Sequence, residues 1–103
     1  CPVEPCNVMY GIYSAVTRMD LNGYPEGGWL PEQKISLEEA LYGFTMGASY
    51  ASFEENIKGS VREGKLADFT VLDDDIFQME PEQLKNVAVA ATIINGEIMW
   101  GSL

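Results

Sequence analysis

Apolar residues in the first half of the chain recur at the spacing of an amphipathic helix. Between Asn7 and Met19 they fall three and four positions apart, which places them on one face of a helix. Asn7 stands directly before this run and is a favourable N-cap residue. The pattern predicts a helix over 7–19 with the apolar positions Val8, Met9, Ile12, Ala15, Val16 and Met19.

A second helix is predicted from Ser36 onward. Ser36 and Glu39 match the capping box, in which the serine hydroxyl and the glutamate each accept an N–H of the first turn. We expect Gly47 to break or bend this helix and a short helix to follow over 48–53. The apolar face of the first part consists of Leu37, Ala40, Leu41 and Phe44. The loop at 20–33 that precedes it is rich in glycine and proline, and long ordered loops often form functional rims.

The periodicity changes to that of strands after Lys58. Short strands are predicted at 59–61, 67–72 and 87–94, with one helical turn beginning at Pro81. Asn95-Gly96 then separates 87–94 from a last apolar run, which is a strong signal for a β-hairpin.

Helices therefore come first and strands second, an order that predicts the α+β class or pieces of two different domains. The helical apolar face and the strand face around Val87, Val89 and Ile93 either pack on each other or each lack a partner in the chain.

Composition limits the classes of partner. The 103 residues carry a net charge of −10, which disfavours nucleic acid and anionic membrane surfaces as partners. No apolar run approaches the roughly 20 residues of a membrane span. Cys1 and Cys6 could form a local disulfide, but free thiols in a reducing, cytoplasmic location are the favoured interpretation. The chain begins at Cys1 rather than Met, so we expect a processed chain or a segment of a longer protein.

Histidine, which many hydrolases use as a general base or a metal ligand, is missing from this sequence. Neither a Ser-His triad nor a histidine-rich metal site can therefore be formed by these residues. We interpret Asp73-Asp74-Asp75 as a solvated loop rather than a calcium site, and Glu54-Glu55 as surface charges rather than catalytic acids. The loop Tyr24–Trp29 either covers neighbouring helices or contributes to an active-site rim. Cys1 as an N-terminal nucleophile is the weaker alternative to a cut site.

Three motifs in order resemble the amidohydrolase superfamily. They are the helix from Ile35 to Ala48, the segment Lys58–Asp73 with its Gly59-Ser60-Val61 and Gly64-Lys65-Leu66-Ala67-Asp68 phrases, and the ending Ala91–Trp100. The first half, with Cys1–Pro5, Gly11–Arg18 and Gly27–Gln33, is similar to the family 3 branch, which includes N-substituted formamide deformylases.

The resemblance implies the C-terminal segment of a metal-dependent enzyme. On the family's plan, residues 1–53 form the helical end of a (β/α)₈ barrel and residues 54–103 form part of a small β-sandwich. Pro2, Val3, Glu4 and Trp29 would then lie at the rim of the active site, at the C-terminal face of the barrel. A divalent, zinc-like ion is expected in the longer parent protein, with no metal or catalytic residue in this segment.

The resemblance implies that the parent protein is a hydrolase of non-peptide, amide-type carbon–nitrogen bonds. We expect this segment to be a structural part of that enzyme and to be inactive alone. Its partner would be the remainder of the parent chain. The alternative is a free-standing, small acidic α+β domain that self-associates. In either case we expect the isolated chain to form homo-oligomers, because truncation exposes apolar faces.

Overall fold

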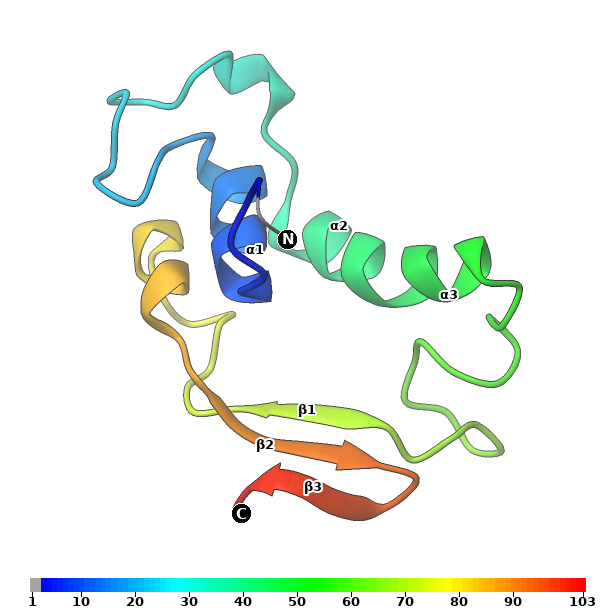
Figure 1. The fold of residues 1–103 in the computed structure, drawn as a ribbon. Coiled ribbons are helices and arrows are strands. Elements are labelled where there is room, and N and C mark those ends of the chain that lie inside the picture. Colours follow the sequence, from blue (N-terminus) through cyan, green and yellow to red (C-terminus); the bar gives the residue numbers. More distant parts are fainter. Residues whose placement is uncertain (1–2) are drawn as a thin grey trace. The chain divides into compact units, whose positions relative to one another are not determined.

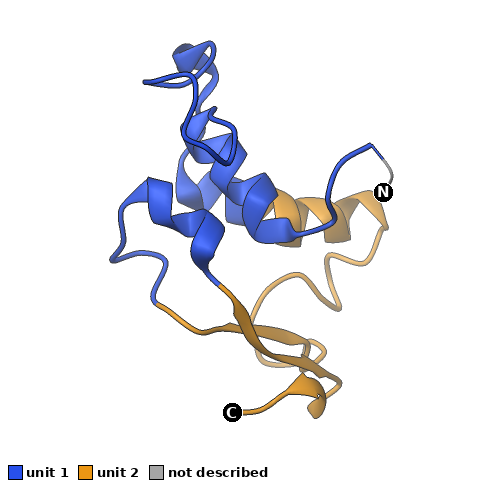
Figure 2. Cartoon of the chain, turned by 60° about the vertical axis from the view of Figure 1, so that its left-hand side comes forward, with its two compact units in different colours: residues 1–41, 75–87 blue, residues 42–74, 88–103 orange. Residues whose placement is uncertain are grey.

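The computed structural model describes residues 3–103 and confirms the α+β class (Figure 1). The helices are α1 (Val8–Thr17), α2 (Leu37–Tyr42) and α3 (Ala48–Ala51), and the strands are β1 (Phe69–Leu72), β2 (Val89–Ile94) and β3 (Glu97–Gly101). No helix in this part of the chain is both long and apolar enough to cross a membrane. The chain divides into two compact units (Figure 2). Unit 1 comprises residues 1–41 and 75–87, and unit 2 comprises residues 42–74 and 88–103.

Unit 1 is built on α1, whose start is confirmed. The Asn7 side chain accepts the N–H of Met9 at 2.9 Å, as expected of an N-cap. Helix α1 packs on η3 (Pro81–Asn86), a 3-10 helix with proline at its start, at the position where the sequence predicts a helical turn. Their shared core is closed, with Tyr13 and Leu84 almost fully buried.

The capping box at the start of α2 is also confirmed. The Glu39 N–H donates to the Ser36 hydroxyl at 3.0 Å, and the Ser36 N–H donates to the Glu39 carboxylate at 2.8 Å. Of the two expectations for Gly47, a break or a bend, the break does not occur. Gly47 keeps right-handed helical angles and ends a π-helical turn, η2 (Gly43–Gly47), that joins α2 to α3. The wider π-helical turn accommodates Gly43 and Gly47, and the helical run continues through both glycines.

Unit 2 contains an antiparallel sheet in the order β1-β2-β3 (Figure 1). Asn95 and Gly96 form the tight turn of the β2–β3 hairpin at φ 51° and 82°, which confirms the sequence signal. This turn is also held from outside the hairpin. The Gly96 N–H donates to the Ala67 carbonyl, and the Asn95 N–H donates to the Asp68 carboxylate at 2.8 Å.

The strand predicted at 59–61 does not form. Gly59 adopts φ 90°, outside the extended region, and Val61 is 81% exposed with no strand beside it. The reason is a close approach to α3: a Cβ on Gly59 would lie 2.4 Å from the Ser49 Oγ and 3.1 Å from the Met46 Sδ. Residues 59–61 therefore belong to a loop that packs closely against α3 at Gly59. Strand β1 begins only at Phe69.

Gly59→Ala should destabilise the protein more than Gly64→Ala. Both positions have φ near 90°, but nothing lies within 4 Å of a Cβ on Gly64. The control should cost about 1–2 kcal/mol for its backbone angle alone. Gly59→Ala should add roughly 1–3 kcal/mol for overlap with Ser49. Thermal unfolding followed by circular dichroism measures the difference, and equal losses would show that the contact with α3 is unimportant.

Candidate functional site

Trp29, the aromatic residue expected at a rim, is fixed by Arg18. The Trp29 N–H donates to the Arg18 carbonyl at 2.8 Å, and the Arg18 Nε donates to the Trp29 carbonyl at 3.0 Å. The guanidinium carbon also lies 5.2 Å from the centre of the indole ring, a cation–π distance. Arg18 itself ends α1 in the left-handed conformation. The indole remains 63% exposed, so its outer face is open to contacts.

The loop that carries Trp29 is anchored to the core of unit 1. The buried Tyr13 donates its hydroxyl to the Asp20 carbonyl at 2.7 Å, and the Asp20 carboxylate accepts the N–H groups of Asn22 and Tyr24. The Lys85 ammonium lies over the Tyr13 ring and donates to the Leu21 carbonyl at 2.6 Å. These bonds make the loop an ordered element rather than a loose connection.

The other expected rim residues lie before α1. Val3 and Glu4 are exposed, in the segment that leads into the N-cap, and Pro2 lies outside the described residues. Within residues 3–103, every hydrogen bond and ring contact of Trp29 is made with Arg18. Hydrogen bonding therefore does not join Trp29 to Val3 or Glu4, and a rim role for the four residues stays a prediction.

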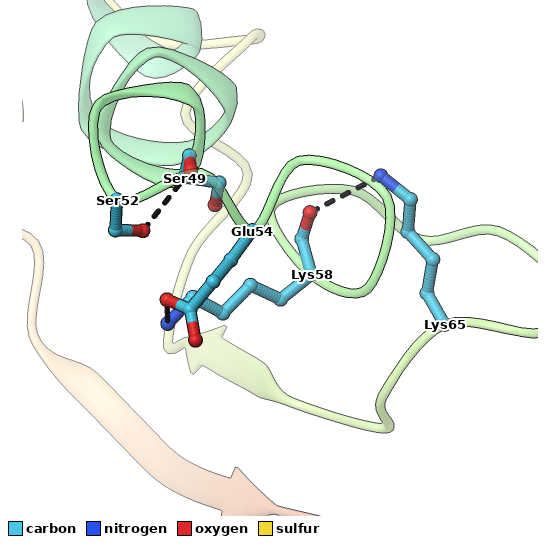
Figure 3. A network of polar contacts seen from close by, with 5 residues as sticks. All are labelled: Ser49, Ser52, Glu54, Lys58 and Lys65. Atoms are coloured by element: carbon cyan, nitrogen blue, oxygen red, sulfur yellow. Dashed lines mark hydrogen bonds and ion pairs between the residues drawn. The ribbon is translucent and has the colours of Figure 1, made fainter.

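A second group of polar contacts, which the sequence analysis did not single out, surrounds the Lys65 ammonium in unit 2. Figure 3 shows its hydrogen bond to the Lys58 carbonyl. The turn that starts at Glu54 leaves the carbonyls of Glu55 and Lys58 pointing at the Lys65 ammonium. The ammonium donates to these oxygens at 2.5 and 3.1 Å and lies 3.7 Å from the Met46 Sδ. Gly64, at φ 88°, turns the chain so that Lys65 reaches back. In the sequence, the only indication of this group of contacts was the Gly64-Lys65 pair, a glycine that permits a sharp turn followed by a cationic residue.

Glu54 and Glu55 are neighbours in sequence but lie in different environments. Glu54 forms an exposed ion pair with Lys58, as expected of a surface charge (Figure 3). Hydrogen bonds from Lys58 and Ser52, together with the Lys58 charge, hold the pKa of the Glu54 carboxyl below its usual value. Glu55 differs from the surface interpretation, because its Oε2 atom is buried without a hydrogen-bond partner among the described residues, as is the Ser60 Oγ.

Glu55, Ser60 and Lys65 border the same hollow of about 350 Å³ on unit 2. Tyr42, Met46 and Arg62 complete much of its wall. Its lining residues include one carboxylate, that of Glu55, and two cationic side chains, those of Lys65 and Arg62. The residues that line it include no pair of a nucleophile and a histidine base.

The residues described do not suit a catalytic metal. No group of three or more histidine, cysteine, aspartate or glutamate side chains converges within residues 3–103. Two carboxylates of the acidic run are used by the backbone: Asp73 accepts the Ala88 N–H at 2.9 Å, and Asp75 accepts the Phe77 N–H at 3.0 Å. Cys6 is an exposed free thiol. These residues therefore give no basis for deriving a metal-dependent step.

Comparison with known proteins identifies the family. The model of the amidohydrolase family matches residues 1–100. This chain therefore belongs to the amidohydrolase family, as its three ordered motifs indicate. No solved structure gives a significant match.

Curated relatives match nearly the whole chain. The putative amidohydrolase YtcJ of Bacillus subtilis is 33% identical over 96% of this chain, and the protein LONG AFTER FAR-RED 3 of Arabidopsis thaliana is 30% identical over 96%. The N-substituted formamide deformylase of Arthrobacter pascens is 28% identical over 94%. The matched region covers only 19%, 16% and 17% of these three proteins, so the chain spans less than a fifth of their length.

Lys65→Met should destabilise the protein more than Lys58→Met, although both remove one positive charge. Lys65 satisfies two carbonyls, and hydrogen bonds from charged groups contribute about 1.5–3 kcal/mol each. Lys58 forms an exposed pair, which contributes little. Urea unfolding should therefore give a loss of at least about 2 kcal/mol for Lys65→Met and a much smaller loss for Lys58→Met. Equal losses would contradict the anchoring role of Lys65.

Lys58→Met should also raise the pKa of Glu54 toward its ordinary value, because the Lys58 hydrogen bond is the largest cause of the depression. The folded-state pKa lies below the unfolded one. The contribution of this pair is therefore present above the unfolded pKa and is lost as the pH falls through the folded pKa. A carbon-13 NMR titration of the Glu54 carboxyl measures the shift. An unchanged pKa in the variant would assign the depression to Ser52.

Proposed function

We propose that residues 1–103 are the C-terminal segment of a metal-dependent hydrolase that acts on non-peptide, amide-type carbon–nitrogen bonds. The family match along residues 1–100 carries this proposal. The name of the Arthrobacter pascens relative, an N-substituted formamide deformylase, supports the bond type. A divalent ion in the parent would supply Lewis-acid chemistry to water and carbonyl groups, and its ligands would come from outside the described residues.

The segment's own role in this proposal is structural: it completes the (β/α)₈ barrel and the small β-sandwich of the parent. The burial of apolar side chains supports this. Among the described residues, unit 1 has seven buried apolar residues and unit 2 has one, Ala91. Three strands with so small a core are marginal alone. Ile98, Met99 and Trp100 of β3 are all at least half exposed, and they offer apolar area to further strands.

The ordered loop of Trp29 is the part of the segment that we place nearest the parent's substrate. Its exposed indole is held at fixed orientation by Arg18, as suits a rim residue. Pro2, Val3 and Glu4 belong to the same proposed rim, on the segment that precedes α1. None of these residues is proposed to perform a chemical step.

The second candidate is a free-standing acidic interaction domain that self-associates. The exposed apolar side chains of β3 favour it, because an unpaired apolar edge strand promotes pairing between chains. Its partner would be a second copy of the chain. Sedimentation of the isolated 103 residues should reveal dimers or larger species. A monomer at high concentration would count against self-association.

The proposal predicts that the parent protein, and not residues 1–103 alone, contains metal and hydrolyses N-substituted formamides. Elemental analysis should find zinc or another divalent ion in the parent, and chelation should abolish hydrolysis. The same assays on residues 1–103 should give background values, because their described side chains offer no ligand group. Stoichiometric metal and turnover in the isolated segment would overturn the structural role. A parent without either would overturn the hydrolase assignment.

A further inference from the structure

The turn between β2 and β3 is an Asn-Gly pair, a sequence in which the asparagine side chain readily loses its amide nitrogen. Asparagine is a thermolabile residue, and a following glycine has no Cβ to hinder attack by its backbone nitrogen. Asn95 and Gly96 are both exposed, so water reaches them. Both also adopt positive φ values, 51° and 82°. The tip of the hairpin therefore brings together the groups that this reaction needs.

The reaction requires only water as a second reactant. The Gly96 nitrogen loses its proton and forms a bond to the side-chain carbonyl carbon of Asn95, and the side-chain nitrogen leaves as ammonia. Water then opens the cyclic imide at either carbonyl, which gives aspartate or isoaspartate at position 95. Both products carry a negative charge that asparagine lacks. Isoaspartate also inserts a methylene group into the main chain.

Two contacts from the segment before β1 oppose this reaction. The Gly96 N–H, whose proton must leave, donates to the Ala67 carbonyl at 2.9 Å. The Asp68 carboxylate accepts the neighbouring Asn95 N–H at 2.8 Å. A carboxylate beside an amide also disfavours loss of the amide proton, because the two negative charges repel each other. Separation of the turn from residues 67–68 removes both obstacles at once.

The chain contains a second Asn-Gly pair, Asn22-Gly23 in unit 1, which is held by local contacts. The Gly23 N–H donates to the Asp20 carbonyl at 3.0 Å, and the Asn22 N–H donates to the Asp20 carboxylate at 2.8 Å. Both partners belong to the same turn. Asn95 depends instead on Asp68, which lies 27 positions away in the chain. Loss of that long-range contact therefore frees the turn at 95–96 and leaves the turn at 22–23 as it is.

We propose that Asn95 is a site of spontaneous deamidation and that the contacts of Ala67 and Asp68 with the turn set its rate. While these contacts are formed, the Gly96 nitrogen is held from attack, and each opening of the turn permits the reaction. The product favours the open form, because a carboxylate at position 95 repels Asp68 and an isoaspartate lengthens the two-residue turn. Deamidation thus makes a transient opening permanent.

The test is peptide mass spectrometry of the full-length protein during incubation at neutral pH, with isoaspartate detected by enzymatic methylation. Asp68→Ala should raise the deamidation rate at Asn95 by about tenfold, the change expected when one hydrogen bond to a charged group is lost. The rate at Asn22 in the same sample is the control and should not change. An unchanged rate at Asn95 overturns the proposal. Equal rises at both sites would indicate general unfolding, and the hydrogen-exchange comparison then decides.

Hydrogen exchange of the Gly96 amide in the protein without substitutions gives this second measurement. It reports how often the Gly96 N–H leaves the Ala67 carbonyl. Deamidation at Asn95 should be slower in the folded protein than in urea by the same factor that slows this exchange. A folded-state rate equal to the rate in urea would show that the contacts give no protection, which overturns the proposal. Neither measurement depends on catalysis by the protein.

Discussion

The bonds from the Lys65 ammonium to the main chain organise the irregular half of unit 2. Between α3 and β1 the backbone forms neither helix nor strand, so its carbonyls must find other donors or stay unpaired. Lys65 supplies such donors to Glu55 and Lys58 at once. The loop is then closed further by the Leu66 N–H, which donates to the Ile57 carbonyl at 2.9 Å. One half-buried lysine side chain thus supplies hydrogen bonds that a helix or sheet would otherwise provide.

In this structure the residues of the family motif, Lys58–Asp73, mainly fix the course of the backbone. Gly59 allows close approach to α3, Lys65 gathers carbonyls, and Asp68 caps the turn of the β2–β3 hairpin. Each needs its own residue type for a steric or hydrogen-bonding reason. A signature of an enzyme family can therefore lie in residues that hold the fold.

Local signals were the predictable part of the fold. Asn7, the Ser36–Glu39 box and the Asn95-Gly96 turn each act within four residues, and all three form as expected. The strand at 59–61 failed because its conformation is set by Ser49, ten residues away, which periodicity does not record. The burial of the Glu55 oxygen was invisible for the same reason. The sequence Glu54-Glu55 does not indicate which of the two carboxylates is buried, because this depends on the conformation of the turn at 54–58.

The π-helical turn η2 adds one residue to a helical run that would otherwise repeat every 3.6 residues. Each residue advances a helix by about 100°, so the extra residue sets the direction in which the side chains of α3 point. Met46 and Ser49, which contact Lys65 and Gly59, lie in or just after the turn. Deleting a single residue from 43–47 would leave the helix itself intact. It would rotate the surface against which the family motif packs, so helix content alone would not reveal the damage.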